Sequence, residues 1–383
     1  MMAVRRPELV IAEWPTRAGL LENPYRELLD SGLKQSFTID HMPFEPNGNW
    51  AQLVGRDVDI VHIHWPESLW RGHEPGEAVD AVERLRRTLK IVHRNGGRVV
   101  FTVHNHGHHD GPEPGDADGY RMLFDIADLV LCHSQMSKRW VREQGRRRNV
   151  MVMPIGTYAP VHTAGRGRED VVRQLGLDPN VPLVVCPGQL RNYKGLSVAL
   201  DACALACGAW QLVVVGRPGP GFDLDAFRRQ LDAVGHATLV NEHVGDELFG
   251  ELLAAADVVA LPYTGITSSS VPPAAWAVGT PIVASRLPYF EEILEPWLGE
   301  MFETGHALDL DGAVRDVLAW PALEVARATA ARTADLDWSK VTGPLRARYA
   351  RWVRVRPIRL QALRTGRIAR RAIRKALAKF RRS

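Results

Sequence analysis

The sequence predicts an α/β protein made of two doubly wound domains that face a cleft, followed by a basic helix. Three observations lead to this prediction. The chain has 383 residues, which is too long for one compact core. Short apolar runs alternate with amphipathic stretches, which is the pattern of parallel sheets whose strands are joined by helices. The alternation also restarts halfway along the chain, which favours two domains over one.

In the first half, five short apolar runs are the expected strands. They lie at 8–14, 59–65, 98–104, 128–134 and 150–156. The segment 76–97 has apolar residues at helical spacing and ends in Gly96-Gly97, a pair typical of a helix end. We therefore place the first domain at 1–157.

The second half begins after a segment, 158–170, that lacks apolar periodicity and is typical of a linker. Its expected strands lie at 182–188, 210–216, 237–240, 257–263 and 281–285. We place the second domain at 171–335, a return helix at 336–355 and a tail at 356–383. Ligands of such sheets bind at the carboxyl ends of the strands, so motifs that directly follow a strand are candidate sites.

The composition is that of a soluble globular protein, with 45% hydrophobic and 24% charged residues. No segment approaches the roughly 20 apolar residues that a membrane-spanning helix needs. The start offers only the run "LVIA", which is too short for a signal peptide. We therefore expect a cytoplasmic protein, with its four cysteines reduced and buried: Cys132, Cys186, Cys203 and Cys207.

The basic charge is concentrated at the carboxyl end. Residues 345–383 contain 15 Arg and Lys and no acidic residue, whereas residues 1–344 contain 33 basic and 44 acidic residues, a net charge of −11. Within 356–383, apolar residues recur at steps of three and four: Ala369, Ile373, Ala376, Leu377 and Phe380. This pattern predicts a basic amphipathic helix that binds the anionic inner face of the cell membrane. A disordered end is one alternative and a nucleic-acid contact another, but the body shows no nucleic-acid fold and no such partner is expected.

A candidate anion site follows the strand at 182–188. Arg191 and Lys194 lie in the turn between Pro187-Gly188 and a helix that begins near Gly195. Two cations beside a helix start would stabilise a bound anion. The alternative is a solvated basic turn.

A second candidate anion site follows the strand at 257–263. Small residues lead to Ser268, Ser269 and Ser270, and Pro272 and Pro273 suit the first turn of a helix. Ser270 is the expected helix N-cap, and backbone N–H groups at this helix start would bind a phosphate. An ordinary cap is the alternative, but two such sites on one sheet favour a diphosphate. By contrast, "GRPGPG" at 216–221 has the wrong spacing for a dinucleotide fingerprint and is expected to be a loop.

Several segments together resemble a known family. "PGQLRNYKGLSVALDA", "LVVVGRPG", "AADVVALPYTG" and "AAWAVGTPIVAS" resemble the carboxyl-terminal domain of glycosyltransferases with two Rossmann-like domains, the GT-B fold. More specifically, they resemble the large "glycosyl transferases group 1" family of bacterial mannosyl- and glucosyltransferases. "NPYRELL", "DIVHIHWPE", "TVHN" and "LVLCHS" extend the resemblance over about 8–355.

The resemblance implies a metal-independent hexosyltransferase without a cofactor. Such an enzyme would move a sugar from a UDP- or GDP-linked donor to a lipid-linked or other saccharide acceptor, in surface polysaccharide or glycolipid synthesis. Neutralisation of the donor's charge by Arg191, Lys194 and backbone N–H groups would take the place of a metal ion.

The resemblance also implies roles for individual residues. Arg191 and Lys194 would bind the donor diphosphate, the backbone of Ser268–Ser270 would hold its distal phosphate, and His104 would face the donor sugar. Weaker candidates for the nucleotide or the sugar are Gly188, Glu291 and Glu292. Many members carry two glutamates eight positions apart, where this chain has Ile266 and Ala274. The chain therefore resembles a subset with a Ser/Gly-rich loop, which leaves the ribose contact and the stereochemical outcome open.

The histidine-rich segment "FTVHNHGHHD", 101–110, has two interpretations. Imidazole and carboxylate groups at this spacing suit zinc, so a zinc hydrolase that uses 104–110 is an alternative. Later strands, however, supply no obvious further ligands. In the glycosyltransferase interpretation, His104 binds a sugar hydroxyl, and His109 or Asp110 contacts the acceptor.

Two further questions stay open at the level of sequence. Glu67 is a candidate catalytic residue beside His104, His109 and Asp110. Trp65 and Trp70 lie near it in the sequence, and carboxylates beside aromatic faces suit carbohydrates. Buried tryptophans beside a capped loop are the alternative. In an inverting reaction Glu67, His109 or Asp110 would act as the base, and in a retaining one the donor phosphate would take the proton. A non-catalytic nucleotide-sugar-binding protein is the remaining alternative.

Overall fold

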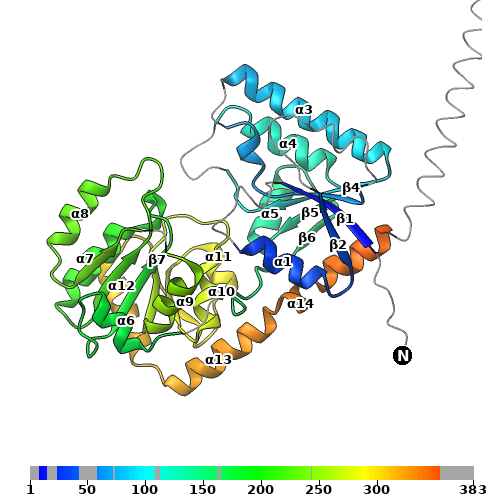
Figure 1. Cartoon of the computed structure of the whole chain (residues 1–383). Helices are drawn as coiled ribbons and strands as arrows, with labels where there is room; N and C mark the ends of the chain where they lie inside the picture. Colours follow the sequence, from blue (N-terminus) through cyan, green and yellow to red (C-terminus); the bar gives the residue numbers. More distant parts are fainter. Residues whose placement is uncertain are drawn as a thin grey trace, which may run out of the picture. The chain divides into compact units, whose positions relative to one another are not determined.

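The computed structural model describes residues 8–14, 24–42, 58–71, 74–107, 113–161, 165–242 and 244–353. The chain forms two compact units. The first comprises the described residues up to Cys132, Ser137–Met153 and those from Thr342 onward, and the second comprises His133–Met136 and Pro154–Val341. Each unit contains a six-stranded parallel sheet with helices around it, which confirms the predicted α/β class with two doubly wound sheets (Figure 1).

The first sheet has the strand order β2-β1-β3-β4-β5-β6. Its strands are β1 (Glu8–Trp14), β2 (Thr38–Met42), β3 (Ile60–Ile63), β4 (Arg98–Val103), β5 (Leu129–Cys132) and β6 (Val150–Val152). Its helices are α1 (Tyr25–Leu33), the short 3-10 helix η2 (Pro66–Leu69), α3 (Pro75–Arg94), α4 (Asp116–Ile126) and α5 (Gln135–Glu143), followed late in the chain by a helix at 343–353. The predicted end of α3 is confirmed, because Gly96 follows it with φ +84 and the Gly97 amide donates to Val92 O at 3.0 Å.

The two faces of the first sheet are covered by different helices (Figure 1). Val61, Ile63 and Phe101 pack toward α3 and α4 in one apolar cluster. Because successive side chains of a strand alternate between faces, His62 points to the other face, where the Tyr349 hydroxyl of helix 343–353 lies 3.4 Å from His62 Nδ1. Arg346 of the same helix donates to Gly32 O of α1. The last described residues thus complete the first unit.

The second sheet has the strand order β12-β11-β10-β7-β8-β9. Its strands are β7 (Leu183–Pro187), β8 (Gln211–Val215), β9 (Ala237–Val240), β10 (Val258–Leu261), β11 (Ile282–Ser285) and β12 (Gly299–Phe302). Its helices are α6 (Arg168–Gln174), η3 (Asn192–Lys194), α7 (Leu196–Ala206), α8 (Leu224–Asp232), α9 (Asp246–Ala255), α10 (Val271–Ala277), α11 (Pro288–Ile293), α12 (Ala307–Leu318), α13 (Ala322–Asp335) and α14 (Trp338–Val341). The expected linker at 158–170 differs from the structure at its end, where 168–170 form the first turn of α6.

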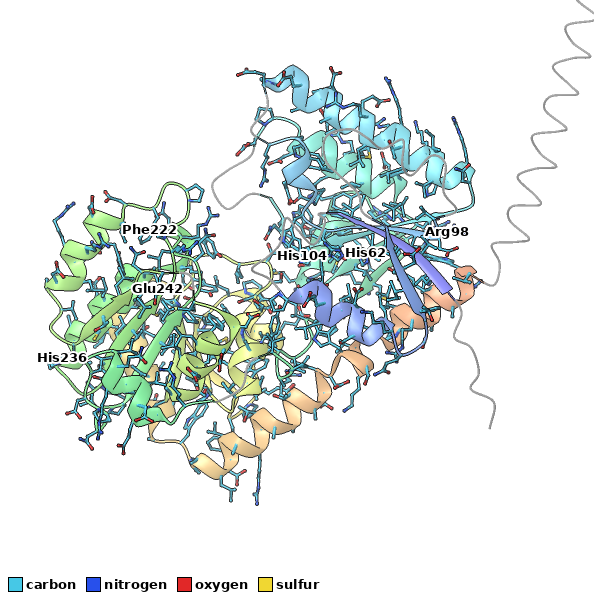
Figure 2. The ribbon with its side chains drawn as sticks, viewed as in Figure 1. His62, Arg98, His104, Phe222, His236 and Glu242 are labelled. Atoms are coloured by element: carbon cyan, nitrogen blue, oxygen red, sulfur yellow. The ribbon has the colours of Figure 1, made fainter. Side chains whose placement is uncertain are left out.

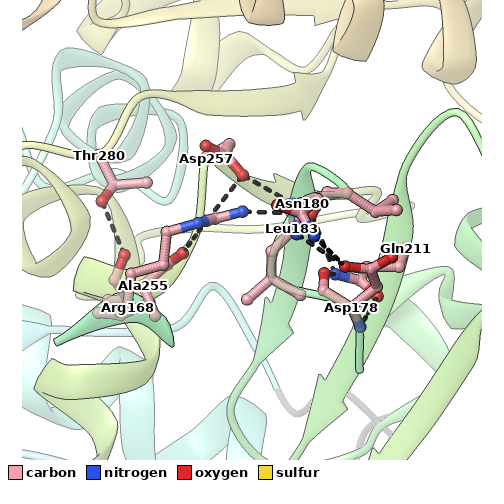
Figure 3. A network of polar contacts seen from close by, with 10 residues as sticks. Arg168, Asp178, Asn180, Leu183, Gln211, Ala255, Asp257 and Thr280 are labelled. Carbon is pink, nitrogen blue, oxygen red and sulfur yellow. Dashed lines mark hydrogen bonds and ion pairs between the residues drawn. The ribbon is translucent and has the colours of Figure 1, made fainter. Parts of the chain in front are cut away.

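Polar side chains close the amino edge of the second sheet (Figure 3). Asp257, just before β10, accepts a hydrogen bond from the Leu183 amide at 2.7 Å and pairs with Arg168 at 2.8 Å. Gln211, the first residue of β8, donates to the carbonyl oxygens of Asp178 and Val181. These contacts join the starts of three strands, so this edge contributes to stability.

Replacing Asp257 by alanine is therefore expected to destabilise the second unit by about 1 to 2 kcal/mol, because the Leu183 amide and the Arg168 guanidinium each lose a partner. Urea unfolding measures this as a lower midpoint. Arg173→Ala is the matched control, since it breaks an ion pair whose side chains are 65% and 70% exposed. It is expected to cost less than about 0.5 kcal/mol. Equal midpoint shifts for the two variants would contradict the assigned role of Asp257.

Three of the four cysteines are buried as expected: Cys132, Cys186 and Cys203. Cys207 is exposed, because it follows the end of α7 in a left-handed conformation with φ +51.

Among the described residues, no helix is both long and apolar enough to cross a membrane. The expected basic helix at 356–383 lies outside the described residues.

Candidate functional site

The loop after β7 forms the first part of the candidate site. Gly188 follows β7 with φ +91, and η3 leads into α7. The Lys194 side chain folds back over this loop: its Nζ donates to the Pro187 carbonyl oxygen at 2.8 Å and lies 5.7 Å from the centroid of the Tyr263 ring. A Cβ at position 188 would lie only 2.7 Å from Nζ. The glycine therefore leaves the room that the ammonium group needs.

Lys194 is an unusual cation because it is only 6% exposed. Burial lowers its pKa to about 8, and the charge of Arg191 acts in the same direction. Near neutral pH the group is still mostly charged. Because water stabilises a buried charge poorly, an anion beside this ammonium group would stabilise it strongly.

Arg191 lies against the loop that follows β8. A Cβ at position 219 would overlap its guanidinium group, so Gly219 allows the close approach. The two loops are joined by hydrogen bonds of 2.8 Å from the Leu190 amide to Arg217 O and from the Gly219 amide to Leu190 O. The segment 216–221 is thus a loop, as predicted, and it supports the side chain of Arg191.

The loop after β10 is tied to the same edge of the sheet. The Thr264 amide donates to Tyr193 O at 2.7 Å. Tyr263, whose ring lies below the Lys194 ammonium group, forms a hydrogen bond with Ser269, and the Tyr289 hydroxyl donates to Ser269 O at 3.0 Å. The fold therefore brings the serines at 268–270 and the two cations to one sheet edge.

The start of α10 agrees with the expectation in position but not in its capping contact. Ser270 is the N-cap residue, and Pro272 and Pro273 lie in the first turn, as predicted. The side chain of Ser270 makes no capping bond, however; the Val271 amide donates to Ser269 Oγ instead, at 3.2 Å. The Ser270 side chain lies beside the Tyr158 hydroxyl instead. Since prolines have no N–H and the Val271 amide is engaged, the first helical turn offers little to an anion. The backbone of 268–270 is the part of this segment that remains suited to binding an anion.

The two weaker carboxylate candidates lie on α11 and differ in their surroundings. Glu292 accepts hydrogen bonds from the Gln135 and Met136 amides at 2.5 and 2.9 Å. Its carboxylate therefore accepts from the first two amides of α5. These two residues, Gln135 and Met136, belong to the second unit. Glu291 is exposed.

A cluster of aromatic and histidine rings lies at the carboxyl edge of the first sheet, and Figure 2 shows His62 and His104 there. His104 follows β4, and its Nε2 lies 3.0 Å from Nδ1 of His64, which follows β3. Trp65 stacks on the His104 ring with centroids 3.9 Å apart, and the Tyr25 ring meets it edge-on at 5.0 Å. The sequence interpretation missed His64 and Tyr25 as neighbours of His104. The available signal was the spacing of "HIH" at 62–64. Alternate residues of a strand share a face, so this spacing places His62 and His64 on one face of the sheet, at the edge where His104 follows its own strand.

Glu67 lies in η2, directly after β3, and is 5% exposed. Burial raises its pKa, although the hydrogen bond that it accepts from the Tyr120 hydroxyl opposes this shift. The two neighbouring tryptophans differ. Trp70 is fully buried and donates to Asp116 at 2.8 Å, so its face is not available to a carbohydrate, whereas Trp65 is only partly buried.

The remaining histidines give no metal centre in the described part of the chain. His106 Nε2 lies 3.1 Å from Ser137 Oγ, its ring stacks on Trp140, and burial lowers its pKa to about 4. His109 and Asp110 lie outside the described residues. Among the residues that are described, no group of three or more His, Cys, Asp or Glu side chains is arranged to hold a metal ion.

Comparison with known proteins agrees with this geometry. Residues 181–319, which span β7 to β12 and the loops with Arg191, Lys194 and the serines, match the family model of glycosyl transferases group 1. This chain carries a group 1 glycosyl transferase domain. The predicted family is thereby confirmed for residues 181–319.

Curated relatives named as glycosyltransferases align with most of the chain at modest identity. D-inositol 3-phosphate glycosyltransferase of Mycolicibacterium vanbaalenii is 26% identical over 311 residues, which are 76% of this chain and 67% of the relative. Its counterpart in Mycolicibacterium smegmatis is 26% identical over 322 residues, which are 81% of this chain and 71% of the relative.

Solved structures show the same fold. HepE of Anabaena, in complex with UDP and glucose, superposes with a TM-score of 0.68 at 16% identity, covering 90% of this chain and 99% of that one. Sucrose-phosphate synthase of Thermosynechococcus elongatus superposes with a TM-score of 0.60 at 17% identity, covering 97% of this chain and all of its own. The group 1 domain thus lies in a chain whose fold as a whole is GT-B.

Proposed function

We propose that this protein is a nucleotide-sugar-dependent glycosyltransferase that binds the donor diphosphate at the carboxyl edge of its second sheet. Lys194 carries the proposal. Its ammonium group is buried, and in the described part of the chain it makes no ion pair with a carboxylate. A buried charge without a counter-charge is costly, so this arrangement suits a site whose counter-charge arrives with the ligand.

In the proposed reaction, the second unit stabilises the leaving nucleoside diphosphate. Arg191 and Lys194 neutralise its charge, and the backbone of Ser268–Ser270 donates hydrogen bonds to the distal phosphate. Gly188 allows the phosphates to approach Lys194 closely. The solved HepE structures with UDP and with UDP-glucose support a uridine nucleotide as the first donor to test.

The first unit supplies the groups for the sugar and the acceptor. His104 donates or accepts a hydrogen bond with a donor-sugar hydroxyl. In an inverting reaction Glu67 is the candidate base with the clearest physical basis, because its raised pKa brings it closer to neutral pH. His109 and Asp110 are further candidates. In a retaining reaction the donor phosphate takes the acceptor proton.

The acceptor in this proposal is a saccharide, free or lipid-linked, in surface polysaccharide or glycolipid synthesis. The sequence of 356–383 supports binding to an anionic membrane surface, where lipid-linked acceptors lie. In this proposal the donor site needs neither a metal ion nor another cofactor, since two cations neutralise charge on the diphosphate and backbone amides donate hydrogen bonds to it.

The proposed function is tested by calorimetric titration of chelator-treated protein with UDP and, separately, with GDP. Micromolar binding of one nucleotide identifies the donor base, and release of that nucleotide from UDP-glucose or GDP-mannose then tests for turnover. Absence of binding, together with stoichiometric zinc in the untreated protein, would favour the zinc hydrolase. Binding of a nucleotide sugar without turnover by any saccharide acceptor would favour the non-catalytic binding protein.

Nucleotide affinity is expected to fall as the pH rises above about 8. Lys194 titrates near this pH in the free protein, and only its charged form binds a diphosphate well, so binding takes up a proton at higher pH. Each pH unit above the free pKa weakens binding about tenfold, because one pKa unit corresponds to a tenfold change in the charged fraction. Calorimetry from pH 7 to 9.5 measures this, in buffers of different ionisation enthalpy. A Lys194→Arg variant that still binds should show a flat profile, and a flat profile in the unchanged protein would contradict the role of Lys194.

A further inference from the structure

The helix α5 and the turn after it carry a concentration of positive charge that the donor site does not use. Residues 138–148 contain six basic residues and one acidic residue, a net charge of +5. The rest of 1–344 contains 27 basic and 43 acidic residues, a net charge of −16. A positive patch on an otherwise acidic body attracts polyanions to one place. This segment is therefore a candidate for contact with a polyanion.

The cations lie on the exposed side of α5 and in the turn before β6. Ser137 and Val141 are buried and mark the side of α5 that packs on the first unit. At about 100° per residue, the basic residues at 138, 139 and 142 fall within one arc of the helix that contains neither Ser137 nor Val141. Arg146 is engaged, because its Nη2 donates to Ala127 O at 2.7 Å. We define the cationic face as the other five basic side chains, of which the first is half-buried and four are exposed: Lys138, Arg139, Arg142, Arg147 and Arg148.

The protein itself does not neutralise the cationic face. Among the described residues, none of its five side chains forms a hydrogen bond or an ion pair. Exposed arginines on other helices, by contrast, pair with a carboxylate one turn away: Arg87 with Glu83, Arg173 with Glu169, Arg228 with Asp225 and Arg327 with Glu324. Unneutralised cations on one surface repel one another, and a bound polyanion relieves this repulsion.

We propose that the cationic face binds the anionic surface of a phospholipid bilayer. The surroundings of its aromatic residue favour a bilayer over a nucleic acid. Sites for single-stranded nucleic acids combine cations with exposed aromatic rings on which the bases stack. Trp140, the aromatic residue of α5, is half-buried and instead stacks on the His106 ring, with centroids 4.4 Å apart. The cationic face thus offers charge without a stacking surface, which suits lipid headgroups.

The helix α5 also connects the cationic face to the part of the first unit where the acceptor is expected. It begins after β5, at the carboxyl edge of the sheet, and Ser137 Oγ in its first turn lies 3.1 Å from His106 Nε2. His106 follows β4 in the same loop as His104. A bilayer held against α5 therefore lies beside the edge that a lipid-linked acceptor has to reach. Only this last step rests on the proposed function, because the charge and exposure of the cationic face do not depend on it.

The test is co-sedimentation of the full chain with vesicles of phosphatidylcholine that contain about one third phosphatidylglycerol. The unchanged protein should bind these vesicles and bind phosphatidylcholine alone only weakly. A variant with Arg139→Gln, Arg142→Gln, Arg147→Gln and Arg148→Gln should bind the anionic vesicles about 100-fold more weakly or worse, since each basic residue near such a surface contributes about fivefold. Undiminished binding of this variant, or no binding by the unchanged protein, would overturn the proposal.

Four paired arginines provide a control with the same change in charge. Arg87→Gln, Arg173→Gln, Arg228→Gln and Arg327→Gln together remove exposed cations whose neighbouring carboxylates already neutralise them. This variant should lose less than about threefold in vesicle binding, because the charges lie outside the cationic face and are screened. Comparable losses for the two variants would show that binding follows total charge. A single-stranded RNA of about 20 nucleotides that binds as tightly as the vesicles, through the same four arginines of the cationic face, would likewise overturn the choice of a bilayer.

A fluorescent label shows whether the cationic face itself meets the bilayer. Cys207, the exposed cysteine, is first replaced by serine, and the label is attached at Gln144→Cys, an exposed position directly after α5. Lipids that carry a nitroxide in the headgroup should quench this label when the protein binds anionic vesicles. A bound but unquenched label would overturn the proposal. Calorimetry with UDP and GDP is independent of these results, so failure of the docking surface and failure of the proposed function are told apart.

Discussion

A protein with Arg191→Ala and Lys194→Met together is expected to bind its nucleotide about 100-fold more weakly, or worse. Hydrogen bonds to charged groups contribute about 1.5 to 3 kcal/mol each, and the double variant removes two cations from one diphosphate. Methionine is chosen at 194 because the side chain is buried, so its stem must be replaced to avoid a cavity. Calorimetry measures the affinity, and urea unfolding checks that stability is retained.

Arg217→Ala is the matched control for the cations. Arg217 is exposed and lies in the loop after β8, where its carbonyl oxygen, rather than its side chain, contacts the loop after β7. Its removal changes the charge near the site by the same amount as Arg191→Ala, but it should weaken nucleotide binding less than threefold, as expected for a screened surface charge. Comparable losses for Arg217→Ala and Arg191→Ala would show that binding depends on overall charge, and the assigned site would be wrong.

Gly195→Ala is expected to be the most disruptive single substitution near the site. Gly195 has φ +60, and a Cβ there would overlap the carbonyl oxygen of Pro262. The substitution therefore combines left-handed strain with a clash against backbone, and we expect a loss of about 3 kcal/mol or more. Because Pro262 precedes Tyr263, the ring beneath Lys194 should move as well. Nucleotide binding should be lost together with stability.

Gly221→Ala separates strain from clash. Gly221 has φ +71, but a Cβ there would have nothing within 4 Å. It should cost only about 1 to 2 kcal/mol, the usual cost of a left-handed conformation. Thermal or urea unfolding of the two variants gives the comparison. Similar losses would mean that the loop after β10 moves aside without cost, and that the contact between the two loops is not rigid.

Much of the fold could be predicted because its central strands are short, continuous apolar runs. β3, β4, β7 and β10 are buried on both faces and have no polar alternation that would obscure them. The two strands that were missed, β2 and β12, lie at sheet edges. Their polar residues, such as the exposed Asp40 and the half-buried Glu300, break the apolar pattern, so only their neighbours in space identify them as strands.

The candidate site was predictable in composition but not in detail. Motif spacing placed Arg191, Lys194 and the serines after strands of one sheet, and the structure brings these loops together. Spacing did not reveal that Lys194 is buried against Tyr263, or that the Ser270 side chain turns to Tyr158 instead of capping α10. Both outcomes depend on side chains more than 60 residues away in the sequence, and no local pattern records them.

The segmented make-up of the first unit has a consequence for how the protein is made. Leu345 and Tyr349 are fully buried in a unit whose sheet is encoded by residues before 153. On the ribosome, only α1 covers the His62 face of that sheet until nearly 190 further residues have been translated. The second unit is almost continuous from Pro154 to Val341, so all of its residues have been translated before helix 343–353 leaves the ribosome. During synthesis, the second unit should therefore complete its folding before the first unit does, although most of the first unit is translated earlier.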